Sequence, residues 1–279
     1  MKKLIAATLI TTMAFSMTAC GTGSSSETTA SVVSTEAKPA ETTSKAETTA
    51  KAPSDKKWII TTDTAFMPFE YTDETGAFVG IDVDILAAVA EDQGFSYDLQ
   101  ILGWDGAVAA VQSGQADAII AGASITEERK ANGWIFTDGY YNATETIAVS
   151  KDTEISSWDD LKGKNVAVKN GTTGCEYAES LKDQYGFTIT KFEDSPTMYQ
   201  DVLSGNSVAC FDDTPVMAAN IKQHDLALKI PDGFENEGSP YGMAIMNSEN
   251  QELIDMFNEG LKNIRANGTY DAILDKYLK

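Results

Sequence analysis

The sequence has little of what metal sites and histidine-based catalysis require. It contains a single histidine, His224, and three cysteines that lie far apart along the chain. Structural zinc sites need clustered cysteines and histidines, and a Ser-His-Asp triad needs a histidine base. We therefore expect no metal, no cofactor and no catalytic residues. His224 lies at the end of a polar helical segment and is expected to face solvent.

Positive charge is also scarce. The chain has 21 lysines and arginines against 42 aspartates and glutamates, which gives a formal net charge of −21. Nucleic acids and anionic membrane surfaces attract proteins with the opposite balance. The segment "GTTGC" lacks the lysine and the spacing of a phosphate-binding loop. Nucleic acid, anionic lipid and nucleotides are therefore excluded as expected partners.

Beyond its N-terminus the sequence has no apolar run long enough to cross a membrane. The chain begins with a basic "MKK", the apolar stretch "LIAATLITTMAFSMTA" and Cys20. This order is typical of a secretory signal peptide, which we assign to residues 1–19. "MTAC" resembles the lipobox of bacterial lipoproteins, with Met17 where leucine is usual, and implies a lipid on Cys20. The alternative is plain secretion, with Cys20 near an ordinary cleavage site.

Residues 20–57 have the composition of a solvated tether. They are rich in serine, threonine, alanine, glutamate and lysine, and no aromatic residue occurs before Trp58. Such a segment cannot bury a core. Its acidic and lysine side chains balance, so the excess negative charge belongs to the remaining chain. A lipid on Cys20 followed by this tether predicts a protein anchored to the outer face of the cell membrane.

From Trp58 onward, strand and helix patterns alternate. "KWIITTD" and "ADAIIAG" are typical of strands, and "IDVDILAAVAEDQG" carries apolar residues at helical spacing. Alternation of this kind predicts an α/β fold with helices on both faces of a parallel sheet. "AVQSGQADAIIAG" and "DVLSGNSVACFDD" share one pattern of helix, Ser-Gly and buried strand, which favours two similar lobes. Cys175 and Cys210 are expected to remain unbridged.

Polar and aromatic side chains follow the predicted strands. In open α/β sheets, ligands bind beyond the carboxyl ends of the strands. We therefore take the residues at these ends as candidates for a binding site. They are Asp63, Phe66, Trp104, Gly122, Ser124, Lys169, Thr173, Asp212 and Asp213, together with Arg129 in the helix that begins after Ser124.

Two of these candidates fit the charged groups of a free amino acid. The guanidinium of Arg129 suits a carboxylate, and backbone amides at helix starts near Ser124 and in "NGTTG" also favour an anion. Asp213 suits an ammonium, which the Ser124 hydroxyl and the Gly122 carbonyl would share. An anion site beside a cation site is what the α-carboxylate and α-ammonium of an amino acid require.

Four further candidates indicate a preference for one side chain. Phe66 and Trp104 supply flat apolar walls. Asp63 accepts and Lys169 donates hydrogen bonds, which matches the NH₂ and C=O groups of glutamine's carboxamide. Glutamate would be repelled by Asp63, and arginine or lysine by Lys169, provided that both residues face the same pocket.

Each of these residues also fits an ordinary structural role, and sequence alone leaves the choice open. "NGTTG" also fits an ordinary turn. The alternatives are a surface position for Arg129 beside Glu128 or Asp138, core packing for Trp104, helix capping or solvation for Asp63 and Asp213, and solvation for Asp212.

Eight motifs taken together make a stronger case. Residues 58–279 resemble the extracellular amino-acid-binding proteins of ABC importers, the polar amino acid family (family 3), and among these the glutamine-binding proteins. The motifs occur in the order and spacing of that family. They are "DTAFMPFEY", "GIDVDILAAVA", "AGASITEERK", "FTDGYY", "VAVKNGTTG", "FDDTPV", "YGMAI" and "LKNIRANGTYDAILDKYL".

The resemblance implies a two-lobed periplasmic-binding-protein-like (type II) fold with two hinge crossings near residues 139–144 and 236–241. Lobe 1 would comprise residues 58–139 and 241–279, and lobe 2 residues 144–236. It also implies a monomer that closes on an L-amino acid, glutamine in preference, and delivers it to a membrane permease without chemistry. The alternatives are arginine or another polar amino acid, an enzyme on the same fold such as a dehydratase, or a sensor module.

The resemblance also implies roles for individual residues. Asp63 and Phe66 match the aspartate and aromatic of "DTAF", and Trp104 matches the aromatic before "DG". Gly122, Ser124 and Arg129 match positions that hold the α-carboxylate, Lys169 and Thr173 match contacts from the second lobe, and Asp213 matches the acid that holds the α-ammonium.

Two residues depart from the family pattern and bear on the side-chain preference. Asp212 stands where some relatives have histidine, and Thr173 where some have glycine. Neighbouring residues of an extended segment point in opposite directions. Asp212 is therefore expected to point away from Asp213, toward the rim or solvent, and would favour a cationic ligand if it pointed inward.

Overall fold

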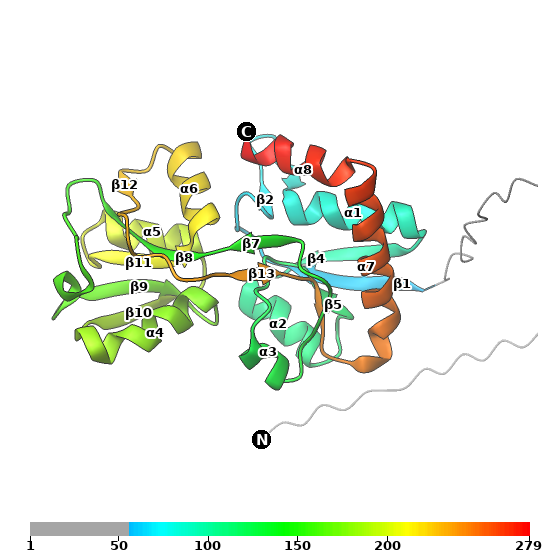
Figure 1. Cartoon of the computed structure of the whole chain (residues 1–279), viewed down its shortest axis with the longest axis horizontal. Helices are drawn as coiled ribbons and strands as arrows, with labels where there is room; N and C mark the ends of the chain where they lie inside the picture. The colour runs from blue at the N-terminus through cyan, green and yellow to red at the C-terminus, as the bar shows by residue number, and fades with distance from the viewer. Residues whose placement is uncertain (1–55) are drawn as a thin grey trace, which may run out of the picture. The chain divides into compact units, whose positions relative to one another are not determined.

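The computed structural model describes residues 56–279 (Figure 1). The predicted signal peptide, the predicted lipidation site Cys20 and the tether up to residue 55 lie outside these described residues. No helix in the described part of the chain is both long and apolar enough to cross a membrane.

One sheet, called sheet I here, is built from both ends of the described chain. Its strand order is β4-β1-β5-β14-β6, with β1 parallel to β4 and β5, and β14 antiparallel to β5 and β6. A short hairpin of β2 and β3 follows β1. The bounds are β1 (Lys57–Thr62), β2 (Tyr71–Thr72), β3 (Phe78–Val79), β4 (Ser96–Ile101), β5 (Ala118–Ile119), β6 (Ile135–Phe136) and β14 (Ala244–Ile245).

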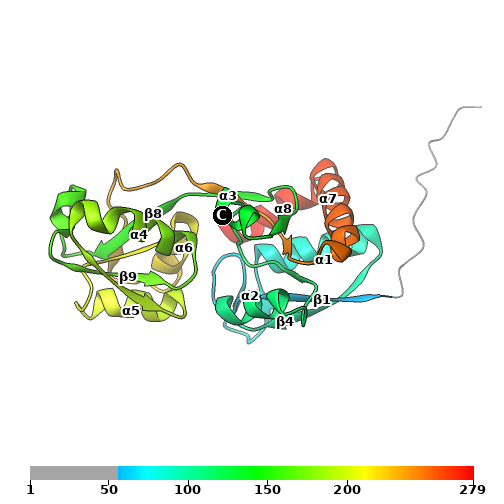
Figure 2. The same cartoon turned by 90° about the horizontal axis from the view of Figure 1, so that it is seen from below.

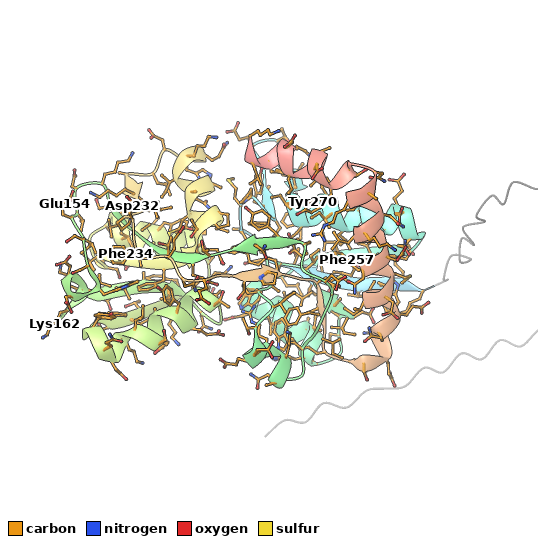
Figure 3. All side chains as sticks on the ribbon, viewed as in Figure 1. Glu154, Lys162, Asp232, Phe234, Phe257 and Tyr270 are labelled. Carbon is orange, nitrogen blue, oxygen red and sulfur yellow. The ribbon has the colours of Figure 1, made fainter. Side chains whose placement is uncertain are left out.

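Helices cover both faces of sheet I. On one face α1 (Ile81–Gln93) packs beside α7 (Gln251–Ala266) and α8 (Thr269–Leu278) (Figures 1 and 2). On the other face lies α2 (Trp104–Gln112). Phe257 is one of the buried residues of α7 and packs in the same hydrophobic core as residues of α1 (Figure 3). Two apolar layers therefore stabilise this half, as the alternating pattern predicted.

A second sheet, sheet II, has the order β10-β9-β11-β8-β12. β9 runs parallel to β10 and β11, whereas β8 runs antiparallel to β11 and β12. Phe234 belongs to one of its two cores (Figure 3). The bounds are β8 (Glu145–Ser150), β9 (Asn165–Lys169), β10 (Thr188–Phe192), β11 (Ala209–Asp213) and β12 (Leu228–Lys229).

The helices of this half are α4 (Thr173–Tyr185), α5 (Ser195–Leu203) and α6 (Thr214–Gln223). Residues of α4 pack in one core, and residues of α5 and α6 pack in the other. Ser157 and Asp160 form a capping box that opens the short 3₁₀ segment Trp158–Leu161. The predicted α/β class is confirmed, but the predicted parallel sheet is wrong in part. Both sheets are mixed, because β8 and β14 run antiparallel to their neighbours and each follows a short strand rather than a helical crossover.

Two strands link the halves. β7 (Tyr141–Ala143) precedes β8, β13 (Ser239–Tyr241) follows β12, and the two strands pair antiparallel. They fall within the segments 139–144 and 236–241, where the crossings were expected. Cys175 and Cys210 are buried and unbridged, as predicted.

Candidate functional site

The strand ends bring most of the predicted site residues to one small cavity. Lys169 ends β9, Asp213 ends β11, and Gly122 and Ser124 follow β5. Eight of the nine predicted ligand-binding residues line the cavity, and Asp63 reaches it through Lys169. Ala121 and Thr172 complete the lining and were not predicted. The lining residues are Phe66, Trp104, Ala121, Gly122, Ser124, Arg129, Lys169, Thr172, Thr173 and Asp213.

Arg129 is a buried cation without a charged partner. It lies in the short helix α3 (Glu127–Ala131), whose first turn is capped by Thr126. Its side chain donates to the Ser124 carbonyl at 3.0 Å and lies over the Trp104 ring at 5.0 Å. It is only 6% exposed, and it forms no ion pair within residues 56–279. The surface position considered as an alternative for Arg129 is therefore wrong. The remaining donors of its guanidinium suit a carboxylate.

Asp213 is the anionic counterpart of Arg129. It is 4% exposed, and its Oδ1 atom is buried without a hydrogen-bond partner. Burial raises the pKa of this carboxyl well above its ordinary value, and the charges of Asp212 and Glu145 raise it further. Asp213 precedes α6 but makes no capping hydrogen bond through its side chain. Asp213 is therefore neither a helix cap nor a solvated acid. A cation in the cavity would provide the missing partner for its buried carboxyl group.

The expectation that Asp212 faces the rim or solvent is wrong. Asp212 does point away from the cavity, but it is 2% exposed. It accepts a hydrogen bond from the Tyr199 hydroxyl at 2.6 Å and another from the Asp213 amide at 3.0 Å. The reason is that β11 is the central strand of sheet II, so helices cover both of its faces.

Asp63 and Lys169 meet in a buried ion pair. Both side chains are 2% exposed. Burial by itself lowers the pKa of Lys169, but the charge and hydrogen bond of Asp63 outweigh it, so the pKa is raised. Asp63 also accepts a hydrogen bond from the Thr64 amide at 2.6 Å. The ammonium further lies over the Phe66 ring at 4.8 Å. The two charges therefore compensate each other, which neither capping nor solvation of Asp63 would do.

Two cavity residues in the half that contains sheet I, Trp104 and Ser124, contact the half that contains sheet II. The Trp104 indole donates to the Gly171 carbonyl at 2.9 Å, so this residue is both a core residue and a wall. The Ser124 and Thr173 hydroxyls are 3.3 Å apart. Thr172 caps α4 through the Cys175 amide, so "NGTTG" forms a helix start at the cavity.

The free space in this cavity is about 10 Å³, which is room for about one water molecule. An amino acid enters only if the walls move. Lys169 and Asp213 come from one half and Phe66 from the other, so a motion that separates the two halves would open the cavity.

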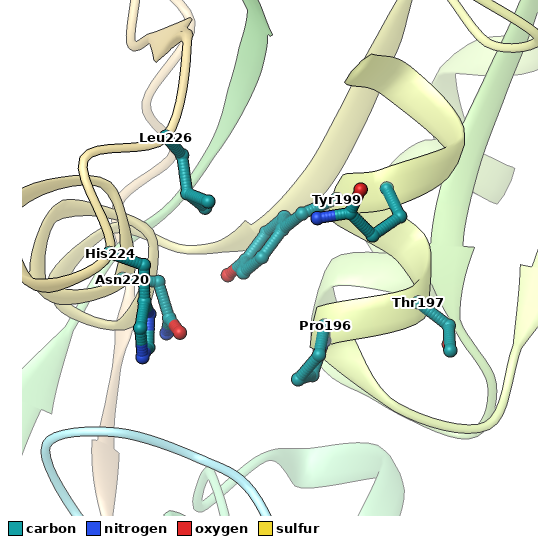
Figure 4. Close-up of a pocket in the computed structure, with 7 residues that line it drawn as sticks. Pro196, Thr197, Tyr199, Asn220, His224 and Leu226 are labelled. Carbon is teal, nitrogen blue, oxygen red and sulfur yellow. The ribbon is translucent and has the colours of Figure 1, made fainter. Parts of the chain in front are cut away.

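A larger cavity of about 420 Å³ lies elsewhere in the second half (Figure 4). Figure 4 shows Pro196 on one side of it and His224 and Asn220 on the other, with the Tyr199 ring between them. His224 is exposed, as predicted. No lysine, arginine, aspartate or glutamate lines this cavity. It therefore lacks the opposite charges that a free amino acid needs.

The fold and the small cavity define an α/β protein with two sheets and a polar cavity at their strand ends. Residues 58–279 match the bacterial extracellular solute-binding proteins, family 3. The chain belongs to this family.

Known members and structures agree with this assignment. A probable histidine-binding protein of Neisseria gonorrhoeae is 31% identical over 80% of this chain and 83% of its own. A solved structure of an ancestral arginine-binding protein bound to arginine has a TM-score of 0.74 at 35% identity, and covers 80% of this chain and 98% of its own. A second solved structure, of an ancestral arginine-binding protein bound to glutamine, has a TM-score of 0.73 at 35% identity, and covers 80% of this chain and 97% of its own. The predicted two-lobed fold is confirmed.

Proposed function

We propose that this protein binds a free L-amino acid in the small cavity and delivers it unchanged to an ABC permease. The observation that carries the proposal is a buried guanidinium without an ion pair, that of Arg129, at the same cavity as a buried carboxyl whose Oδ1 has no hydrogen-bond partner, that of Asp213. A free amino acid brings an α-carboxylate and an α-ammonium, which would satisfy both. Relatives described as binding histidine, arginine or glutamine support the same ligand class.

Glutamine is the amino acid that the side-chain end of the site favours. Asp63 and Lys169 neutralise each other, so the pair offers one acceptor and one donor but no net charge. A carboxamide uses both without leaving a charge unpaired. Glutamate would add a second negative charge beside Asp63 in a buried site, which is costly.

Arginine is the second candidate, because one similar structure is described as bound to arginine. Its guanidinium would have to take Asp63 away from Lys169 and leave the ammonium buried without its partner. Asp212 was the other acid that could have held a cation, but it does not line the cavity. We therefore rank arginine below glutamine.

The same proposal covers the organisation of the whole chain. We propose lobe 1 as residues 58–139 and 241–279, lobe 2 as residues 144–236, and β7 with β13 as the hinge between them. Cys20 would carry a lipid after removal of the signal peptide, and the tether would hold the monomer at the outer face of the membrane. Ligand would be bound and released without turnover.

The test is isothermal titration calorimetry on residues 21–279, unfolded and refolded to remove retained ligand. We expect saturable binding of L-glutamine that is about a hundredfold tighter than binding of L-glutamate or L-arginine, or about 2.7 kcal/mol. A preference for arginine would overturn the role of Asp63 and Lys169 but keep the ligand class. No heat with glutamine, glutamate, arginine, histidine or cystine would overturn the ligand class itself.

A further inference from the structure

Two acidic side chains lie buried behind the cavity wall without a cation. Glu70 and Asp82 are both 0% exposed. Both oxygens of Glu70 and the Oδ1 of Asp82 have no hydrogen-bond partner. Buried polar atoms without partners are rare and each needs an explanation. Neither residue belongs to the predicted or observed lining of the cavity.

The backbone holds these two residues against each other. The Asp82 amide donates to the Phe69 carbonyl at 2.9 Å. Gly80, just before α1, has a φ of +145°, and a Cβ atom there would be 2.7 Å from the Glu70 amide nitrogen. The first turn of α1 is thus pressed onto the segment that carries Glu70, and the two carboxyl groups interact.

Each acid is tied to a different wall of the cavity. Glu70 pairs with Phe66 through backbone hydrogen bonds of 2.7 and 3.2 Å. Asp82 Oδ2 accepts the Gly122 amide at 2.7 Å and the Tyr140 hydroxyl at 2.7 Å. Gly122 has a φ of +55°, and a Cβ atom there would be 2.4 Å from the Phe66 ring. The position of one wall therefore limits the position of the other.

We propose that Glu70 is protonated and donates a hydrogen bond to Asp82 Oδ1, and that this acid pair is a positioning unit for Phe66 and Gly122. A single proton gives partners to an oxygen on each acid and removes the repulsion between two buried negative charges. Asp82 then accepts three hydrogen bonds as a carboxylate. The effect on affinity rests on the function proposed above, whereas the proton itself does not.

The surrounding charges agree with one retained proton. Burial raises the pKa of Glu70 well above its ordinary value, Asp82 and Asp63 raise it further, and Lys169 opposes them. Burial raises the pKa of Asp82 to about 6, against hydrogen bonds from Tyr140, Gly122 and Glu70. Lys169, the cation that opposes this rise, is already paired with Asp63. Because the hydrogen bond between the two acids raises the pKa of Glu70 and lowers that of Asp82, these shifts favour Glu70 as the protonated member of the pair.

The proton can be measured without any ligand. Infrared spectra of residues 21–279 at neutral pH, with carbon-13 in the glutamate side-chain carboxyls, should show a protonated carboxylic acid band that shifts on labelling. Glu70→Gln should remove it, and Glu91→Gln, the same change at an exposed position of α1, should leave it. Absence of a glutamate band, or its survival in Glu70→Gln, would overturn the proposal; buried water would then account for the unpartnered oxygens.

The positioning role needs a second readout. Glu70→Gln keeps a donor to Asp82, whereas Glu70→Met removes it. Glu70→Met should speed hydrogen exchange of the Gly122 amide and weaken L-glutamine binding about tenfold, which equals about 1.4 kcal/mol. Glu70→Gln should keep both properties near those of the wild type. The wild type should lose affinity as rising pH ionises Glu70. Glu70→Gln should not show this loss.

A merely structural role would lower stability without separating these pH profiles. Equal pH profiles for the wild type and Glu70→Gln would overturn the positioning role. If Glu70→Met does not fold, the pH profiles of affinity for the wild type and Glu70→Gln still test the positioning role. If even the wild type does not bind glutamine, the proposed function fails, while the infrared band and Gly122 exchange still decide the inference.

Discussion

Arg129 and Asp213 differ from Asp63 and Lys169 in how their charges are balanced. The latter two neutralise each other in a buried ion pair. The former are buried to a similar degree, yet neither forms an ion pair within residues 56–279. Removing charge from water without pairing it costs free energy. The folded protein therefore carries a local instability at these two residues, which a ligand with opposite charges would relieve.

Replacing Asp213 should separate stability from binding. The folded state raises the pKa of this carboxyl above 3.8, so the folded chain holds a proton that the unfolded chain releases. Stability therefore falls as pH rises from about 3.8 toward the folded pKa. Asp213→Asn cannot titrate and should be more stable than wild type at mildly alkaline pH. It should bind glutamine more weakly by about 2–5 kcal/mol.

Chemical denaturation across pH and calorimetric titration measure these two effects. Asp152→Asn is the matched control, because Asp152 is exposed and does not line the cavity. It should change neither property. An Asp213→Asn protein that binds glutamine as tightly as wild type would remove this residue from the ammonium site.

At the scale of elements, β11 carries two adjacent acids to opposite faces of sheet II. Asp213 faces the cavity, while Asp212 meets the Tyr199 hydroxyl of α5 at 2.6 Å. Burial raises the pKa of Asp212, and the hydrogen bond from Tyr199 lowers it, as does the charge of Lys169. The strand is thus fixed to α5 by a buried polar contact directly behind the small cavity.

Tyr199→Phe should weaken this element without changing the ligand site. The substitution removes one donor and leaves Asp212 Oδ2 buried without it, which should cost about 1–3 kcal/mol of unfolding free energy. Affinity for glutamine should stay within about twofold, because Tyr199 does not line the small cavity. Urea unfolding measures this loss of unfolding free energy. Tyr185→Phe in α4 is the control, because no such hydrogen bond is lost there. Unchanged stability would mean that Asp212 gains little from Tyr199.

Sequence reasoning located residues at the cavity where their position follows from a strand end. Strand ends and charge type were enough to place Lys169 and Asp213 there, and Arg129 was found in the helix that begins after Ser124. The burial of Asp212 was missed because alternation gives the face of a strand but not what covers it. Asp82 was missed because an acid in the first turn of a helix ordinarily favours solvent and the helix dipole. Only the close packing of α1 on the Glu70 segment turns Asp82 inward.

At the scale of the whole molecule, several contacts join the two halves around the cavity. Besides the ion pair of Asp63 with Lys169, the Trp104 indole reaches the Gly171 carbonyl. The Asn170 amide donates to Asp105 at 2.9 Å. Asp105 is exposed and does not line the cavity, so in the proposed closure of the two lobes it would act on the closed arrangement alone. A contact that favours closure should strengthen binding of every ligand by one common factor, since each ligand binds the same closed state.

Asp105→Ala should therefore weaken all amino acids that bind without changing their order of preference. Loss of one hydrogen bond of this kind corresponds to about a two- to tenfold increase in Kd. Asp105→Asn, which keeps an acceptor for Asn170, should recover most of this loss. Calorimetric titration with glutamine and with the next best ligand measures both factors. If only one ligand were weakened, Asp105 would act on ligand selection, and the proposed closure of the two lobes would lose this support.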